Sequence, residues 1–297
     1  MRKEASGPPA AKEETSIPAA AGETAGAAPA EETASLALTP EGVRRGLLIL
    51  VNAAHPLADD FEDPEKNGGL VQIAPGIELD PEAAGRLAEA LAAVGCTDEI
   101  LPVSGYRSRD EQEKIFRDSL EEKGRAFTES FVARPGASEH QTGLAVDLGE
   151  NKPPIDFICP AFPDRGFCRA FRLAAPDFGF ILRYREEKEK ITGIAREPWH
   201  FRYVGFPHSR IITDRGMALE EYLDFLPGFP FADKPLVYQA GEGTVYRIGY
   251  LPAPPQNGAG RTVAALKLPA GSRYSISGDN KAGFIITTKV KKRRGRP

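Results

Sequence analysis

The segment Ser138-Glu-His-Gln-Thr-Gly-Leu-Ala-Val-Asp-Leu148 combines a short turn with an apolar strand. Side chains alternate along a β-strand, so Val146 and Leu148 are expected to face one side of a sheet and Asp147 the other. An aspartate within an apolar strand is costly to bury unless it is paired or binds a metal ion. His140 lies in the turn just upstream, close enough to share a set of metal ligands with Asp147.

A second pair of acidic and imidazole side chains stands in Glu197-Pro-Trp-His-Phe201. The spacing of three residues would place Glu197 and His200 on one face of a helix, but Pro198 disfavours helical backbone at the residue before it. We therefore expect both residues at the beginning of a β-strand. The chain has only four histidines, and two of them, His140 and His200, lie within these motifs.

Two imidazoles, a carboxylate and a spare carboxylate are the components of a catalytic zinc site. Such a site uses three protein ligands and keeps a fourth position for water, and the spare carboxylate can remove a proton from that water. The sequence therefore predicts one zinc ion per chain, held by His140, Asp147 and His200, with Glu197 beside it. The alternative is four polar residues with separate structural partners, which is the commoner situation for any one histidine taken alone.

Composition and charge narrow the class of protein. The formal net charge is −4 and the sequence pI is about 5.8, so the chain lacks the basic surface that binds nucleic acid. No apolar run approaches the ~20 residues that span a bilayer, and residues 1–37 contain no apolar signal segment. The cysteines leave two possibilities open: Cys159 and Cys168 form a disulfide, or both are ordinary core residues, with Cys96 unpaired in either case.

The chain divides into four parts by composition. Residues 1–40 are rich in Ala, Glu and Pro and cannot bury enough apolar surface to offset the entropy of ordering, which predicts a disordered tether. Residues 41–228 are the expected main domain, which ends in the Pro-rich hinge Leu226-Pro-Gly-Phe-Pro230. Residues 235–290 are expected to form a small β module that the main domain can fold without, and residues 291–297 a basic tail.

Apolar spacing and turn residues place the secondary structure. Helical spacing with capping signals predicts helices over residues 80–94, 108–124 and 164–175. Apolar runs predict strands over residues 143–148, 179–184 and 199–204, and a further set after the hinge at 244–250, 262–268 and 283–288. Helices and strands joined by short links indicate an α+β fold, with an antiparallel sheet and flanking helices that carry the zinc site, plus the small C-terminal all-β module.

The chain resembles the VanY-type D-alanyl-D-alanine carboxypeptidases, which are zinc peptidases related to the VanX-type D,D-dipeptidases. The motifs that carry the resemblance are Ser104-Gly-Tyr-Arg-Ser108, Ser138-Glu-His-Gln141, Gly143-Leu-Ala-Val-Asp-Leu148 and Glu197-Pro-Trp-His-Phe201. The similarity extends from about Leu47 to Leu223. One departure is Ala53-Ala54, where relatives often carry a charged residue, and it concerns no catalytic position. The C-terminal β module also resembles an appendage of some members.

The resemblance implies specific roles for seven residues. It implies that His140, Asp147 and His200 hold zinc and that Glu197 is the catalytic base. It also implies that Arg107 stabilises the oxyanion, whereas Gln112 and Ser138 hold the terminal carboxylate of the substrate.

The activity implied by the resemblance is removal of the terminal D-alanine from peptidoglycan stem peptides that end in D-Ala-D-Ala. This substrate would place the enzyme outside the membrane, in the cell envelope. Two alternatives stay open at this point. One is a D,D-dipeptidase or a peptidoglycan endopeptidase on the same fold, and the other is a non-catalytic zinc fold that binds the cell wall.

Overall fold

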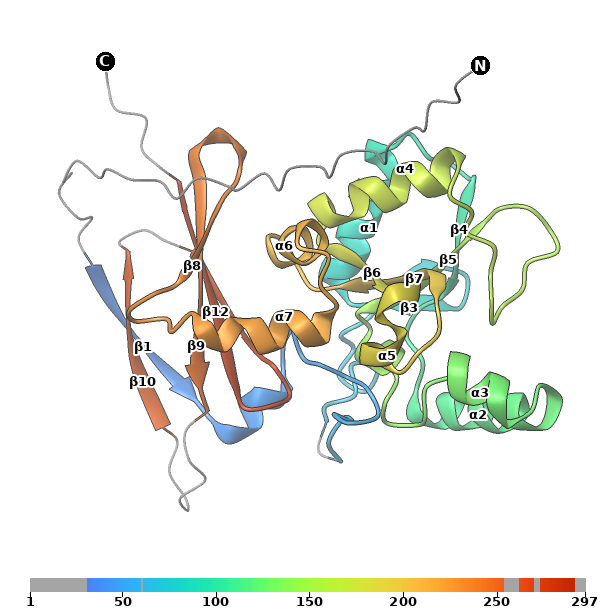
Figure 1. Cartoon of the computed structure of the whole chain (residues 1–297), viewed down its shortest axis with the longest axis horizontal. Helices are drawn as coiled ribbons and strands as arrows, with labels where there is room; N and C mark the ends of the chain where they lie inside the picture. Colours follow the sequence, from blue (N-terminus) through green and yellow to red (C-terminus); the bar gives the residue numbers. More distant parts are fainter. Residues whose placement is uncertain (1–30, 60, 254–261, 270–272, 292–297) are drawn as a thin grey trace, which may run out of the picture.

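The computed structural model describes residues 31–59, 61–253, 262–269 and 273–291. Two antiparallel four-stranded sheets lie side by side, with helix α7 (Leu219–Phe225) between them (Figure 1). The central sheet contains, in order across the sheet, β4 (Ile100–Ser104), β5 (Ala145–Glu150), β7 (Glu197–Tyr203) and β6 (Phe180–Tyr184). The C-terminal sheet contains, in order, β11 (Arg273–Gly278), β12 (Gly283–Lys291), β9 (Thr244–Pro252) and β8 (Leu236–Gln239).

The remaining elements are short. Two further antiparallel pairs join β1 (Glu31–Leu38) to β10 (Thr262–Pro269) and β2 (Val71–Ala74) to β3 (Ile77–Leu79). The other helices are α1 (Pro81–Ala93), α2 (Arg109–Glu122), α3 (Arg125–Phe131), α4 (Gly166–Ala174), α5 (Glu189–Thr192) and α6 (His208–Asp214). This mixture of helices and antiparallel sheets confirms the predicted α+β class and the C-terminal all-β unit.

The central sheet has one apolar and one polar face. Val146, Leu148 and Phe201 belong to a single buried core that includes Leu87 of α1 and Phe171 of α4. Because side chains alternate along a strand, the residues between them in sequence face the other side. The predicted alternation in β5 is therefore confirmed, and helices α1 and α4 cover only the apolar face.

The three helices predicted in the main domain form within one or two residues of the expected bounds. Asp80 caps α1, since its Oδ1 accepts hydrogen bonds from the backbone N–H groups of Glu82 and Ala83 at 2.9 and 3.1 Å. Ser108 and Glu111 form the predicted capping box at the beginning of α2. Each such cap typically contributes about 1 kcal/mol, and it uses only local sequence.

The expectation of a disordered tether over residues 1–40 is wrong for residues 31–38. Residues 31–38 form strand β1, which pairs with β10 over its whole length, from Glu31 opposite Pro269 to Leu38 opposite Thr262. The partner strand supplies the backbone hydrogen bonds that this weakly apolar segment cannot obtain locally. The rest of the expected tether, residues 1–30, and all but the first residue of the expected basic tail lie outside the described residues.

The C-terminal sheet shares a hydrophobic core with the main domain. Ile181 of β6 and Tyr222 of α7 lie in one buried cluster with Ile248 of β9 and Ile285 of β12. Backbone contacts tie the two parts further, since the N–H of Leu48 donates to Ser277 Oγ at 2.9 Å. The two sheets therefore bury one continuous apolar surface. Whether the main domain folds without residues 235–290 stays a prediction.

The structure also bears on two further questions, whether the chain has a disulfide and whether it has a membrane-spanning helix. Cys96, Cys159 and Cys168 are all free, and Cys168 is buried in the core, so the disulfide alternative is excluded. Within the described ranges, no helix is long and apolar enough to cross a membrane.

His208 connects α6 to the C-terminal sheet. Its burial leads to a prediction of how the stability of the protein depends on pH. Its Nδ1 lies 2.7 Å from Tyr222 Oη and its Nε2 lies 2.9 Å from Thr287 Oγ1. Burial lowers the pKa of His208 to about 3, whereas an unfolded chain has a histidine pKa of about 6.5. Below pH ~6.5 the unfolded chain therefore binds a proton that the folded chain does not bind, and stability is lost as the pH falls toward 3.

We expect His208→Gln to reduce this loss, because glutamine keeps a hydrogen-bonding side chain but does not titrate. The free energy of unfolding, measured by urea titration at several pH values between 7 and 4, should fall less steeply in the variant by up to ~1.4 kcal/mol per pH unit. His55→Gln is the control, because it makes the same replacement at a histidine that is only partly buried. Equal slopes in the wild type and His208→Gln would contradict the prediction.

Candidate active site

Three predicted metal ligands converge on the polar face of the central sheet. Asp147 in β5 and His200 in β7 are directly paired across the two strands, so their side chains project from the same face. His140 reaches them from the 3-10 helix Glu139–Thr142, immediately before β5. One ligand atom from each of the three residues lies within 4.8 Å of the others, and all three side chains are buried. This cluster can bind a metal ion.

The hydrogen bonds of His140 leave one ring nitrogen for a metal. Its Nδ1 lies 2.6 Å from the carbonyl oxygen of Gly105, which can only accept, so Nδ1 carries the proton. Its Nε2 then offers a lone pair, 3.2 Å from Asp147 Oδ2. An added Cβ at Gly105 would lie 2.3 Å from the carbonyl oxygen of Glu78, so only glycine allows this close approach to β3.

Two potential ligand atoms of the cluster lack hydrogen bonds. His140 Nε2 and Asp147 Oδ1 are buried, and neither has a hydrogen-bond partner among the described residues. His200 Nδ1 lies 3.0 Å from Asp147 Oδ1. Buried nitrogen and oxygen atoms without a hydrogen bond are costly, and a cation at their centre removes that cost. Two imidazole nitrogens and a carboxylate suit zinc.

Glu197 lies beside the cluster as the first residue of β7. Strict alternation would place residues three apart on opposite faces of a strand, but the pairing of β6 with β7 shifts register between Leu182 and Tyr184. This irregularity brings Glu197 Oε2 to 3.6 Å from His200 Nδ1. Burial raises the pKa of Glu197 to about 8, and a divalent cation next to it would lower that pKa.

The other three predicted residues line the same pocket as the metal cluster. Arg107 Nη2 lies 3.4 Å from Asp147 Oδ2, and its Nη1 donates to Gln112 Oε1 at 3.2 Å. The Nε2 of Gln112 in turn donates to the carbonyl oxygen of Ala133 at 2.7 Å. Ser138 is buried, and its hydroxyl caps no helical N–H. The structure thus brings all seven sequence-predicted residues to one pocket.

Two pocket features were not predicted from the sequence. The ring of Tyr184 packs on His200, with 4.8 Å between the ring centroids. Behind His200, the carboxylate of Glu139 is buried with Arg183 and Arg202, which outweigh the effect of burial and hold the pKa of Glu139 well below its usual range. The sequence did contain a signal for the two arginines, because each interrupts an apolar strand as Asp147 does.

Comparison with known proteins gives consistent matches. A sequence model of the family described as "VanY: D-alanyl-D-alanine carboxypeptidase" matches residues 77–206. The chain is 45% identical over 184 residues to the "Bifunctional D-Ala-D-Ala dipeptidase and D-Ala-D-Ala carboxypeptidase VanXYC" of Enterococcus gallinarum, which covers 60% of this chain and 94% of that relative.

Two solved structures are also similar. One is the vancomycin resistance D,D-dipeptidase VanXYg in complex with a D-Ala-D-Ala phosphinate analogue, with a TM-score of 0.79 and 41% identity over 88% of this chain and 100% of that chain. The other is a mutant of the D,D-pentapeptidase VanY from a VanB-type resistance cassette in complex with Zn(II). It has a TM-score of 0.50 and 33% identity over 60% of this chain and 98% of that chain.

Metal content tests the cluster directly. The protein is expected to hold about one zinc per chain, and His140→Ala, Asp147→Ala and His200→Ala should each be depleted of zinc after dialysis, because two remaining side chains hold the ion weakly. Elemental analysis of the dialysed proteins measures this. His55→Ala is the matched control, because it removes an imidazole outside the pocket. Full zinc content in both His140→Ala and His200→Ala would exclude the cluster as the metal centre.

Proposed function

Because this chain belongs to the VanY family of D-alanyl-D-alanine carboxypeptidases, we propose that it removes the terminal D-alanine from peptidoglycan stem peptides ending in D-Ala-D-Ala. As a member of this family it is a peptidase that uses zinc. The observation that carries the proposal is the placement of Glu197 and Arg107 in one pocket with the buried cluster of His140, Asp147 and His200.

His140 Nε2, a carboxylate oxygen of Asp147 and His200 Nδ1 are the atoms that would hold the zinc ion. Zinc bound there supplies a Lewis acid that polarises a carbonyl group and lowers the pKa of a water molecule toward ~7. The protein contributes orientation, since the Gly105 carbonyl fixes the ring of His140 and the β5–β7 pairing fixes Asp147 opposite His200. A cluster held in this way needs little rearrangement when the substrate binds.

Glu197 is the proposed general base. It lies beside the cluster rather than within it, and its side chain faces the pocket with Arg107. Burial strengthens a carboxylate as a base, because the protonated form becomes easier to reach. In the proposed reaction Glu197 removes a proton from the attacking water and then delivers it to the amine of the departing D-alanine.

Arg107 is the proposed stabiliser of the negative charge that develops on the scissile carbonyl oxygen. Its guanidinium is a cation with several N–H donors. Burial lowers the pKa of Arg107, and the carboxylate of Asp147 opposes that shift. Gln112 and Asp147 hold two of its nitrogens, so the group is oriented before substrate arrives. Ser138 and Gln112 are proposed to bind the terminal carboxylate of the substrate, since the Ser138 hydroxyl can donate and the Gln112 amide has a second N–H beyond the one used by Ala133.

D,D-dipeptidase activity is the second candidate, and one observation favours it. The match to VanXYg covers 100% of the VanXYg chain, and VanXYg is described as a D,D-dipeptidase. The E. gallinarum relative is described as bifunctional. The two activities imply different places of action. A carboxypeptidase that trims stem peptides of the assembled wall works outside the membrane, in the cell envelope, which is the location we propose. A dipeptidase works wherever free D-Ala-D-Ala is present.

Release of D-alanine from two substrates tests the activity and separates the candidates. A stem pentapeptide ending in D-Ala-D-Ala should lose one D-alanine, chelator should abolish the reaction, and added zinc should restore it. Free D-Ala-D-Ala, assayed at the same concentration, measures the dipeptidase activity. Cleavage of the free dipeptide alone would refute the proposed carboxypeptidase, and release of larger fragments from cross-linked peptides would indicate an endopeptidase.

The role of Glu197 is tested by Glu197→Gln, which keeps the shape of the side chain but cannot accept a proton. We expect the variant to retain zinc and to lose about 10²–10⁴-fold in kcat, the usual value of general acid–base catalysis. Zinc content and kcat are measured on the same preparation. Glu150→Gln is the matched control, because Glu150 forms ion pairs at the surface away from the pocket. Loss of zinc in Glu197→Gln would make Glu197 a ligand instead of a base.

A further inference from the structure

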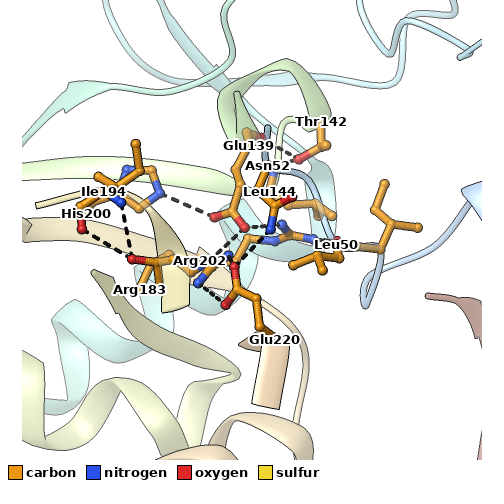
Figure 2. Close-up of polar contacts among 12 residues, drawn as sticks. Leu50, Asn52, Glu139, Thr142, Leu144, Arg183, Ile194, His200, Arg202 and Glu220 are labelled. Atoms are coloured by element: carbon orange, nitrogen blue, oxygen red, sulfur yellow. Dashed lines mark hydrogen bonds and ion pairs between the residues drawn. The ribbon is translucent and has the colours of Figure 1, made fainter. Parts of the chain in front are cut away.

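Glu139 is a buried carboxylate that the proposed chemistry does not use. Only 1% of its surface is exposed, and it lies in the 3-10 helix one residue before His140. One oxygen, Oε1, accepts a hydrogen bond from Arg183 Nε at 2.8 Å and lies 2.9 Å from Arg202 Nη1. The other oxygen, Oε2, faces the ring of His200 at 3.5 Å from Nε2 (Figure 2).

The arginines behind Glu139 are fixed by further contacts. Arg183 Nη1 and Nη2 donate to the two carboxylate oxygens of Glu220 in α7 at 2.8 and 2.7 Å. Asn52 Nδ2 donates to the same carboxylate at 3.1 Å. Arg202 Nη2 donates to the carbonyl oxygens of Leu47 and Ile49. Figure 2 shows Glu139 between this group and His200, so its carboxylate has little freedom to turn.

The two oxygens of Glu139 differ in their surroundings. Both arginine contacts go to Oε1, whereas Oε2 and His200 Nε2 are buried atoms with no hydrogen-bond partner in the described part of the chain. They face each other at the outer limit of hydrogen-bond distance. A carboxylate that served only to neutralise the arginines would not need to leave one oxygen facing an imidazole. The second oxygen therefore has His200 as its natural partner.

We propose that Glu139 is a positioning residue for His200. Its Oε2 accepts the Nε2 proton of His200, which fixes the tautomer and the ring angle that turn the Nδ1 lone pair toward Asp147. This inference rests on the proposed role of His200 as a zinc ligand. Each histidine of the cluster then has its own acceptor, the Gly105 carbonyl for His140 and the Glu139 carboxylate for His200. Outer acceptors of this kind orient ligating histidines and raise their basicity.

Zinc affinity in two matched variants tests the proposal. Glu139→Gln and Glu220→Gln each remove one negative charge next to Arg183, but only Glu139 faces His200. Chelator competition should show zinc binding weakened about 10–100-fold in Glu139→Gln, the usual effect of losing an outer acceptor, and weakened much less in Glu220→Gln. Equal losses in the two variants would overturn the proposal, because the effect would then pass through the buried ion pairs and not through His200.

A measurement on the wild-type protein covers the case in which Glu139→Gln does not fold. With the histidine rings labelled with 15N, the zinc-loaded protein should show His200 protonated at Nε2, with a downfield and slowly exchanging proton. A proton at Nδ1, or an Nε2 proton that exchanges freely, would overturn the proposal. The metal centre is tested separately by His200→Ala. If that variant keeps zinc, the proposed site fails, whereas loss of zinc there with unchanged affinity in Glu139→Gln refutes only the role of Glu139.

Discussion

The pairing of Asp147 with His200 across β5 and β7 is the constraint on which the rest of the structure depends. It places two titratable side chains on one face of a sheet, out of contact with bulk water. Burying such groups is costly unless each is paired or binds a cation. The two faces of the sheet differ in character, since the other side of the same strands packs apolar side chains such as Val146, Leu148 and Phe201 into the core with α1 and α4.

The polar face contains a second layer of charge behind the cluster. Arg183 and Arg202 interrupt β6 and β7 at positions that face the same side as His200, and Glu139 and Glu220 balance them. Buried arginines without carboxylates would leave unpaired charge in the interior, so the four side chains depend on one another. Because they come from four separate segments, they hold those segments in one arrangement around the pocket.

The C-terminal sheet is part of this arrangement. Helix α7 carries Glu220 toward Arg183 and also packs Tyr222 into the core shared with β9 and β12. Helix α7 lies between the two sheets (Figure 1), and its side chains contact both of them: Tyr222 packs in the shared core and Glu220 pairs with Arg183. The match to the D,D-dipeptidase VanXYg covers 88% of this chain, more than the main domain alone accounts for, so the similarity extends into this sheet.

Local sequence determined the helices with their caps, the alternation in β5 and the seven residues that meet in the pocket, because these depend on neighbours within a few positions or on motifs of fixed spacing. Only the tertiary structure revealed the features that depend on residues far apart in the chain. The strand at residues 31–38 pairs with β10 more than 200 residues away, and the C-terminal sheet joins a core that no local pattern reveals. A register shift between β6 and β7 brings Glu197 to His200 against strict alternation. These features are stabilised by strand pairing and side-chain packing between segments that are far apart in the chain. A local stretch of sequence therefore does not reveal them.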